Sequence, residues 1–117
     1  MRRWCGPALA ALPGAALALT ALLGPVPTLR DLPGYFVPLR TRTAEVLHGE
    51  RGPFWNRDVG CGEPFFANPQ SALLYPPAWL AAVLPAERAV GVEAGMHLAW
   101  LAAGCALLAR RLGAGTP

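Results

Sequence analysis

Two long apolar runs lie near the two ends of the sequence, and arginines are found beside each of them. The first run extends from Trp4 to Leu29 without a charged residue, and the second extends from Gly91 to Gly113. A helix that crosses the hydrocarbon core of a bilayer needs about 20 apolar residues. Pro13 and Gly14 lie within the first run, and membrane helices tolerate both residue types. The pattern therefore predicts two transmembrane helices, the second ending near Gly113.

A cleavable signal peptide is the alternative for the first run, with Arg2 and Arg3 as its charged head. The apolar core of a signal peptide is about 7 to 15 residues long and ends in small residues in an A-x-A pattern. The run in this chain is longer and ends in GPVPTLR, which favours a retained anchor. Cleavage would instead release a secreted chain that lacks roughly the first 25 residues.

Residues 30–90, between the two runs, begin with the pattern of a short amphipathic helix. Pro38 suits the first helical position, and Gly49 can end the helix. Apolar or small side chains recur at helical spacing at Leu39, Thr43, Val46 and Leu47, and the polar face carries Arg40, Arg42 and Glu45. We expect this helix to lie along the membrane surface with its polar face in water, and on an outer leaflet this face could also meet anionic lipid head groups.

A further apolar stretch, PFFANPQSALLYPPAWL, is broken by Asn68-Pro69-Gln70 and by Pro76-Pro77. The uncharged part from Ser71 to Ala86 is short for a span, and the paired prolines would kink it. Irregular backbone at membrane depth needs protein or water beside it. The stretch is therefore predicted to be a re-entrant or interfacial segment that does not cross the bilayer.

The composition also favours a membrane protein. Hydrophobic residues make up 54% of the chain and charged residues 15%, whereas a soluble domain carries about 25% charged residues. The basic residues are all arginines, scattered singly or in pairs, so the net charge of +3 does not indicate a nucleic-acid interface. Three cysteines without C-x-x-C spacing predict neither a disulfide framework nor a metal site.

Arginine pairs flank the two runs on their distal sides, at Arg2-Arg3 and Arg110-Arg111. The positive-inside rule then places both termini in the cytoplasm. The predicted organisation is a cytoplasmic start and first helix (1–29), an external loop (30–90), a second helix (91–113) and a cytoplasmic end (114–117). The expected fold is thus an all-α membrane protein, in which two transmembrane helices are joined by an external loop.

Between Arg88 and Arg110 the second run carries the ionisable pair Glu93 and His97, which lie one helical turn apart on the same face. An ionisable pair inside a membrane faces protein or water and is a candidate functional pair. In the alternative interpretation, Glu93 lies near the positive helix N-terminus and His97 is a satisfied interior histidine. The second interpretation is the one we favour.

The blocks RDLPGYFVPLR, PFWNRDVGCGEPFFANPQSALLYPP and HLAWLAAGCALLARRLG occur in this order. Over roughly residues 30–113 the chain resembles the amino-terminal part of the bacterial YfhO family of multi-pass membrane proteins, which look like glycosyltransferases of the GT-C class. The Asn-Pro-Gln-Ser block is the most specific part of the resemblance. Arg57 stands where the family pattern favours proline, and Cys61 interrupts its Gly-Gly pair.

The resemblance implies a catalytic site in the external loop. Enzymes of the GT-C class place an acidic residue early in the first external loop, as base or metal ligand beside a lipid-linked donor, and Asp31 occupies that position. Arg30 or Arg40 could hold a phosphate. The weaker candidates, for shaping the sugar site, are Asn68, Gln70 and Tyr75. Alternatively, Asp31 caps a turn or pairs with Arg30.

The resemblance implies a polyprenyl-phosphate sugar as donor, a cell-envelope acceptor, and a reaction on the outer face of the bacterial cytoplasmic membrane. It leaves a divalent metal cofactor open. Members of the family are several times longer, so the chain is expected to be an amino-terminal part, inactive alone. Its expected partners are the bilayer, the sugar donor and the remaining transmembrane helices. The alternative is a small non-enzymatic two-span protein that binds a partner or lipid through its external loop.

Overall fold

The computed structural model describes residues 6–24 and 30–113 and consists mostly of helices. The chain forms two compact units, of which one contains helix α1 and most of helix α3 and the other spans Val26–Val90. The arginine pair at residues 2–3, the run's end at 25–29 and the expected cytoplasmic end at 114–117 lie outside the described residues.

Helices α1 (Gly6–Leu23) and α3 (Ala86–Arg111) are each long and apolar enough to cross a membrane. Few of their side chains are buried, since only 11% of the most apolar window of each helix is buried inside the structure. The structure thus contains two candidate membrane spans, as the sequence predicted. Helix α3 begins five residues before the predicted start, at Ala86, and includes Glu87 and Arg88 in its first turn.

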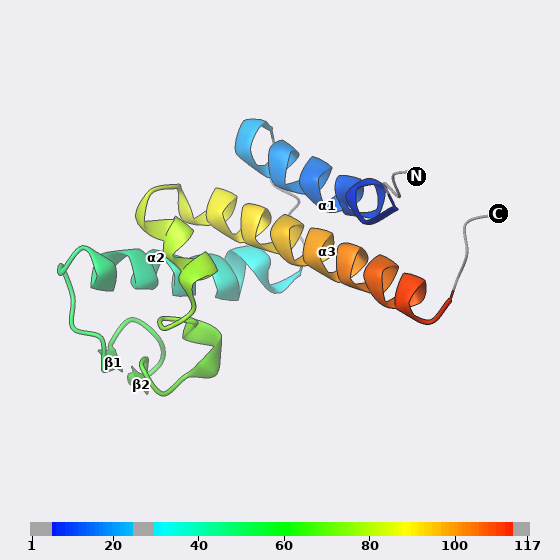
Figure 1. Cartoon of the computed structure of the whole chain (residues 1–117). Coiled ribbons are helices and arrows are strands. Elements are labelled where there is room, and N and C mark those ends of the chain that lie inside the picture. The colour runs from blue at the N-terminus through cyan, green and yellow to red at the C-terminus, as the bar shows by residue number, and fades with distance from the viewer. Residues whose placement is uncertain (1–5, 25–29, 114–117) are drawn as a thin grey trace. The chain divides into compact units, whose positions relative to one another are not determined.

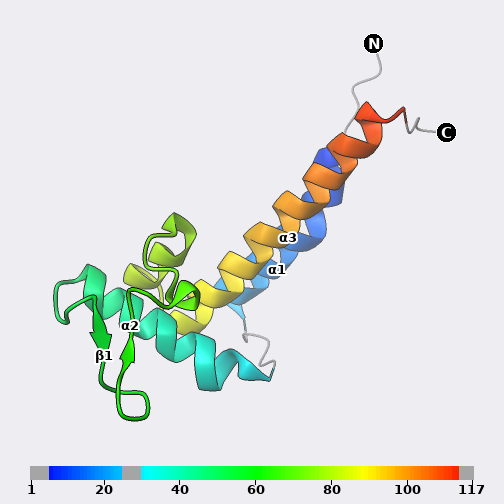
Figure 2. The ribbon, with the colours of Figure 1, turned by 90° about the horizontal axis from the view of Figure 1, so that it is seen from below.

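The two helices pack antiparallel through glycine and alanine, and Figures 1 and 2 both show them side by side. A Cβ added to Gly95 would lie 2.5 Å from the Ala18 nitrogen and 2.7 Å from the Gly14 carbonyl oxygen. A Cβ added to Gly14 would in turn lie 2.6 Å from the Gly95 carbonyl oxygen and against the backbone of Ala99. Small residues four apart on both helices therefore bring the two backbones into contact.

The second unit is built around helix α2 (Val37–Leu47), which a π-helical turn, Leu32–Phe36, precedes directly. Its core consists of Leu39, Phe65 and Leu73, with Tyr35 and Val46 packed against them. The predicted helix is present, but the predicted solvated face is wrong, because Arg40 and Arg42 are each only 6% exposed. The segments that follow the helix supply backbone carbonyls to both guanidinium groups, and these contacts bury them.

A short antiparallel hairpin follows α2, a feature that the all-α prediction did not include. Strand β1 (Trp55–Asn56) pairs with β2 (Glu63–Pro64), so that Trp55 faces Pro64 and Asn56 faces Glu63. Gly62 has a φ of +99°, and a Cβ there would lie 2.9 Å from Cε2 of Trp55. Glycine at this position therefore provides both the turn conformation and the space for the indole ring.

The apolar stretch broken by prolines forms two 3-10 helices, Pro69–Ser71 and Pro76–Ala82. The second of these packs on α2, and its Ala78 and Ala81 are buried. Leu74, Trp79 and Val83 from the same stretch are exposed. The stretch therefore does not form a long helix, and its apolar content is divided between the core of the unit and an outer surface. Its placement in a bilayer stays a prediction.

Candidate functional site

The Asn-Pro-Gln-Ser turn is bound to α2 through its backbone carbonyls. Nη1 of Arg40 donates to the carbonyl oxygens of Gln70, at 3.3 Å, and Ser71, at 3.2 Å. Oγ1 of Thr43, a fully buried residue, shares its one proton between this Ser71 oxygen, at 3.1 Å, and the Leu39 carbonyl oxygen, at 3.0 Å. Hydrogen bonds from a charged donor are stronger than neutral ones, and burial increases their strength further. Arg40 therefore fixes the turn in one position on the helix.

Side chains of the turn make two further hydrogen bonds. The Tyr35 hydroxyl donates to Oε1 of Gln70 at 2.5 Å, which ties the turn to the π-helical segment. Oδ1 of Asn68 accepts a bond from the Gln70 backbone nitrogen at 2.9 Å and so begins the 3-10 helix. Arg40, Asn68 and Gln70, three of the residues predicted from the sequence, thus belong to one network.

Asp31 and Arg30 lie at the start of the π-helical turn, and both are exposed. Asp31 precedes the first π-helical residue and makes no side-chain capping bond, and none of the ion pairs among the described residues includes it. Arg30 adopts a φ of +36°, which is unusual for an arginine. Single π-helical turns occur frequently at functional sites. The carboxylate of Asp31 is therefore accessible to a ligand.

Tyr75 is half-buried and immediately precedes the second 3-10 helix. Its backbone nitrogen donates to Ala72, and its carbonyl accepts from Ala78. The sequence predictions missed Tyr35 and Thr43, the two other side chains that hold the turn. Tyr35 follows Asp31 by four residues, and helical periodicity could have placed them on one face.

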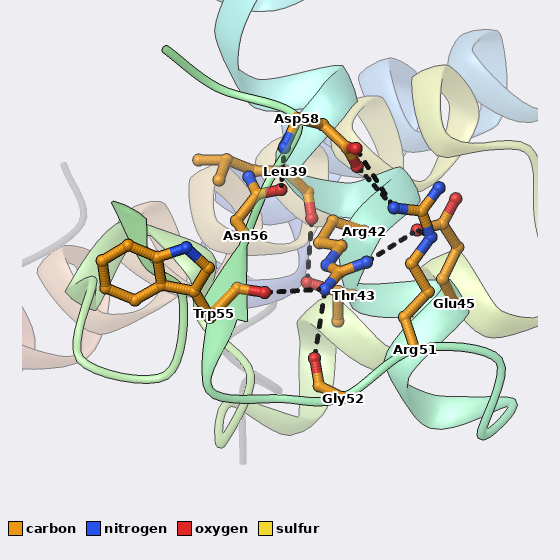
Figure 3. Close-up of polar contacts among 9 residues, drawn as sticks. All are labelled: Leu39, Arg42, Thr43, Glu45, Arg51, Gly52, Trp55, Asn56 and Asp58. Carbon is orange, nitrogen blue, oxygen red and sulfur yellow. Dashed lines mark hydrogen bonds and ion pairs between the residues drawn. The ribbon is translucent and has the colours of Figure 1, made fainter. Parts of the chain in front are cut away.

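A second polar cluster surrounds Arg42, as Figure 3 shows. Nη2 of Arg42 donates to the carbonyl oxygens of Gly52, at 3.1 Å, and Trp55, at 3.0 Å. Nη1 lies 3.4 Å from Oε2 of Glu45, and the guanidinium carbon lies 5.8 Å from the centre of the Phe65 ring. The cluster therefore attaches the hairpin to α2. Among the described residues Arg42 Nε is buried and has no hydrogen-bond partner, which reduces the net stabilisation from these contacts.

Arg51 extends the cluster toward the hairpin turn. Its Nε lies 3.3 Å from Glu45, and its Nη1 lies 2.9 Å from Asp58. The hairpin, the segment that leads into it and Arg42 of α2 also line a pocket of about 430 Å³. None of the site residues predicted from the sequence lines this pocket, whose walls consist of Arg42, Glu50, Arg51, Gly52, Phe54, Trp55 and Arg57.

Glu93 and His97 interact within α3 through the backbone. Nδ1 of His97 lies 2.6 Å from the Glu93 carbonyl oxygen, and the His97 ring meets Trp100 edge-on at 5.6 Å. An imidazole N–H that donates to the preceding turn is satisfied within its own helix. In the described part of the chain, no group of three His, Cys, Asp or Glu side chains could hold a metal ion.

Replacing Asn68 by alanine should destabilise the turn by about 1 kcal/mol, because the Gln70 nitrogen loses its acceptor. Hydrogen exchange followed by mass spectrometry should then show faster exchange in a peptide that covers residues 68–72. Asn68→Asp is the matched control, since its carboxylate oxygen can accept the same bond. Equal protection in the alanine variant and the native chain would contradict the capping role.

Comparison of the chain with protein-family models, with curated proteins and with solved structures finds no match.

Proposed function

We propose that the chain is the amino-terminal part of a membrane glycosyltransferase. It would transfer a sugar from a polyprenyl-phosphate donor to a cell-envelope acceptor on the outer face of the bacterial cytoplasmic membrane. The observation that carries the proposal is the accessible carboxylate of Asp31, placed at the start of a π-helical turn. The resemblance of this segment to the YfhO family supplies the reaction class.

The chemistry requires a base beside the donor. An acceptor hydroxyl that attacks a sugar carbon must lose its proton, and a carboxylate within hydrogen-bond reach can take it. Asp31 has this role in the proposal. Arg30 is the preferred phosphate-binding residue, because Nη1 of Arg40 already donates to two carbonyl oxygens. Gln70, held by Tyr35 and Asn68, presents its side chain from a fixed turn and would contribute to the sugar site.

The proposal places both termini in the cytoplasm and residues 30–90 outside. Its support is the Arg110-Arg111 pair, which forms the last turn of α3. Basic residues beside a span favour the cytoplasmic side. The same pair also interacts favourably with the negative end of the helix dipole. A catalytic unit with this orientation would meet a lipid-linked donor at the outer face.

Asp31→Asn in the complete protein should reduce sugar transfer at least about 100-fold, the usual lower range for loss of a general base. The measurement is incorporation of a radiolabelled sugar into the envelope of cells that express each variant. Asp58→Asn is the matched control, because Asp58 is another exposed aspartate of the same unit and pairs only with Arg51 among the described residues. Full transfer by the Asp31 variant would remove the catalytic assignment.

A small non-enzymatic two-span protein is the second candidate. The backbone contact between α1 and α3 supports it, because two helices in such contact can associate without further spans. Sequencing the transcript past the codon for Pro117 separates the two proposals. An open frame with more apolar runs favours the transferase, and a stop codon favours the small protein.

A further inference from the structure

The hairpin carries three large aromatic side chains that lie outside the hydrophobic core. Phe54 is 71% exposed, Trp55 51% and Phe66 46%. We call these three residues the aromatic patch. Phe65, between them in sequence, is fully buried, so the exposure is specific to these positions. Contiguous exposed apolar surface commonly marks an interaction site.

Contacts within the hairpin hold the side chains of the aromatic patch in place. Phe54 and Phe66 flank the two strands, and their ring centres lie 5.8 Å apart. The Phe65 nitrogen donates to the Phe54 carbonyl oxygen at 2.9 Å, which fixes the spacing of the two phenylalanines. The Trp55 ring lies against Gly62 across the hairpin. All three rings are therefore already exposed in the folded hairpin.

Arg57 supplies a cation beside the aromatic patch. It lines the same pocket as Phe54 and Trp55 and is exposed. Arg51 also lines this pocket, but it already pairs with Glu45 and Asp58. Among the residues that the structure describes, Arg57 takes part in no ion pair. Tryptophan is enriched at the boundary between lipid tails and head groups, and segments that lie in this boundary combine Trp and Phe with Arg on the polar side.

We propose that the aromatic patch docks the hairpin onto the lipid head-group region of the membrane in which α1 and α3 are anchored. The two candidate spans keep the hairpin close to a bilayer, so the effective lipid concentration is high and a modest apolar area suffices. The phenylalanines would insert into the boundary, and Arg57 would contact a lipid phosphate. The proposal requires the spans but not the catalytic role of Asp31.

The charges near the patch indicate what drives docking. Glu50 lines the pocket together with Arg57, and Asp58 pairs with Arg51. The local charge is therefore close to balanced, so burial of aromatic surface contributes more than attraction to anionic lipid. Docking should then differ little between bilayers of phosphatidylcholine and of phosphatidylglycerol, and moderate salt should change it little.

The native cysteines allow a direct test. A nitroxide on Cys61, with Cys5 and Cys105 replaced by serine, reports the hairpin, and a nitroxide on Cys105 alone reports α3; both sites are exposed. The full chain is reconstituted at one copy per lipid nanodisc, which excludes a second copy as the partner. Collision rates with oxygen and with a water-soluble nickel complex give the depth of each label.

Native protein should place the Cys105 label among lipid tails and the Cys61 label at the head-group boundary. Phe54→Ser/Phe66→Ser should lower the ratio of docked to undocked hairpins about tenfold, because two rings lose their apolar environment. Val59→Ser, at another exposed apolar position of the hairpin, should leave the ratio unchanged. Phe54→Leu/Phe66→Leu should dock, which separates lost burial from a folding defect.

The proposal would be overturned if the Cys61 label of the native protein lay in water. It would also be overturned if this label lay at the same depth in the native protein and in Phe54→Ser/Phe66→Ser. An aqueous Cys105 label would overturn its premise that α3 spans the bilayer. Free inorganic phosphate that displaced the hairpin would instead assign the Arg57 pocket to soluble anions and reject lipid docking. Loss of sugar transfer in Asp31→Asn bears on none of these outcomes.

Discussion

Gly95→Leu is expected to separate α1 from α3. The new side chain would meet backbone on the facing helix, since even its Cβ would lie 2.5 Å from the Ala18 nitrogen. Backbone atoms cannot rotate away as a flexible side chain can, so the helices themselves must move apart. Overpacking of this kind costs about 3 kcal/mol. In a bilayer such packing is a principal force between helices, because lipid tails solvate leucine as well as protein does.

Gly104→Leu provides the matched control on the same helix. A Cβ at Gly104 would meet no described atom from outside its own helical turn within 4 Å. The same change in volume, hydrophobicity and helix propensity should therefore leave the pair intact. Nitroxides at the exposed positions Leu12 and Leu98, in a chain without native cysteines, report the separation by pulsed electron resonance. A narrow distance distribution should persist in Gly104→Leu and become broad in Gly95→Leu. The same narrow distribution in both would refute the backbone contact.

The apolar runs were predictable because a membrane imposes a simple length requirement on a helix. Both runs exceed that length and lack charged residues over most of it, and both contain a helix in the structure. The position of the contact between them was not predicted. Gly14, Ala18, Gly95 and Ala99 stand among many other small residues in an alanine- and glycine-rich chain. Sequence alone does not distinguish the small residues that face the neighbouring helix.

The arginines of α2 show why sequence reasoning failed in the external unit. A charged residue on an amphipathic helix is usually solvated, so Arg40 and Arg42 were expected in water. The chain after α2, however, presents four backbone carbonyls that the helix cannot satisfy: those of Gly52, Trp55, Gln70 and Ser71. Arginine carries several donors on a long stem and can reach such groups. The contacts join segments 10 to 31 residues apart in sequence, and local patterns do not reveal them.

One part of the candidate site, the turn at Asn68-Pro69, was predictable from the sequence. Asn68-Pro69 has recognisable turn chemistry, and the structure contains the turn with Asn68 as its cap. Tyr35 and Thr43 hold this turn from 35 and 28 residues away along the chain, and no local pattern indicates that either of them contacts it. The role of Asp31 still depends on the resemblance, because exposure of an aspartate does not by itself indicate a catalytic function.

Arg42→Met is expected to release the hairpin from α2. Methionine keeps the unbranched apolar stem, so the loss is confined to the guanidinium group and its three hydrogen bonds. Two backbone carbonyls would lose their donor, and of its two ion pairs in the described part of the chain Glu45 would keep the one with Arg51. Removing one partner from a buried charged network costs about 3 kcal/mol or more. Peptides that cover residues 52–66 should exchange their amide hydrogens much faster, whereas peptides from α3 should be unaffected.

Arg57→Met is the control that distinguishes loss of the buried Arg42 contacts from a general effect of removing a positive charge. Arg57 belongs to the same hairpin but is exposed, so the identical substitution should change stability by less than about 0.5 kcal/mol. Arg42→Lys adds a stricter test, because a lysine keeps the charge but lacks the planar fork that reaches Gly52, Trp55 and Glu45 together. It should lose most of the stability that Arg42→Met loses. Full protection of the hairpin in the lysine variant would mean that charge alone attaches it to α2.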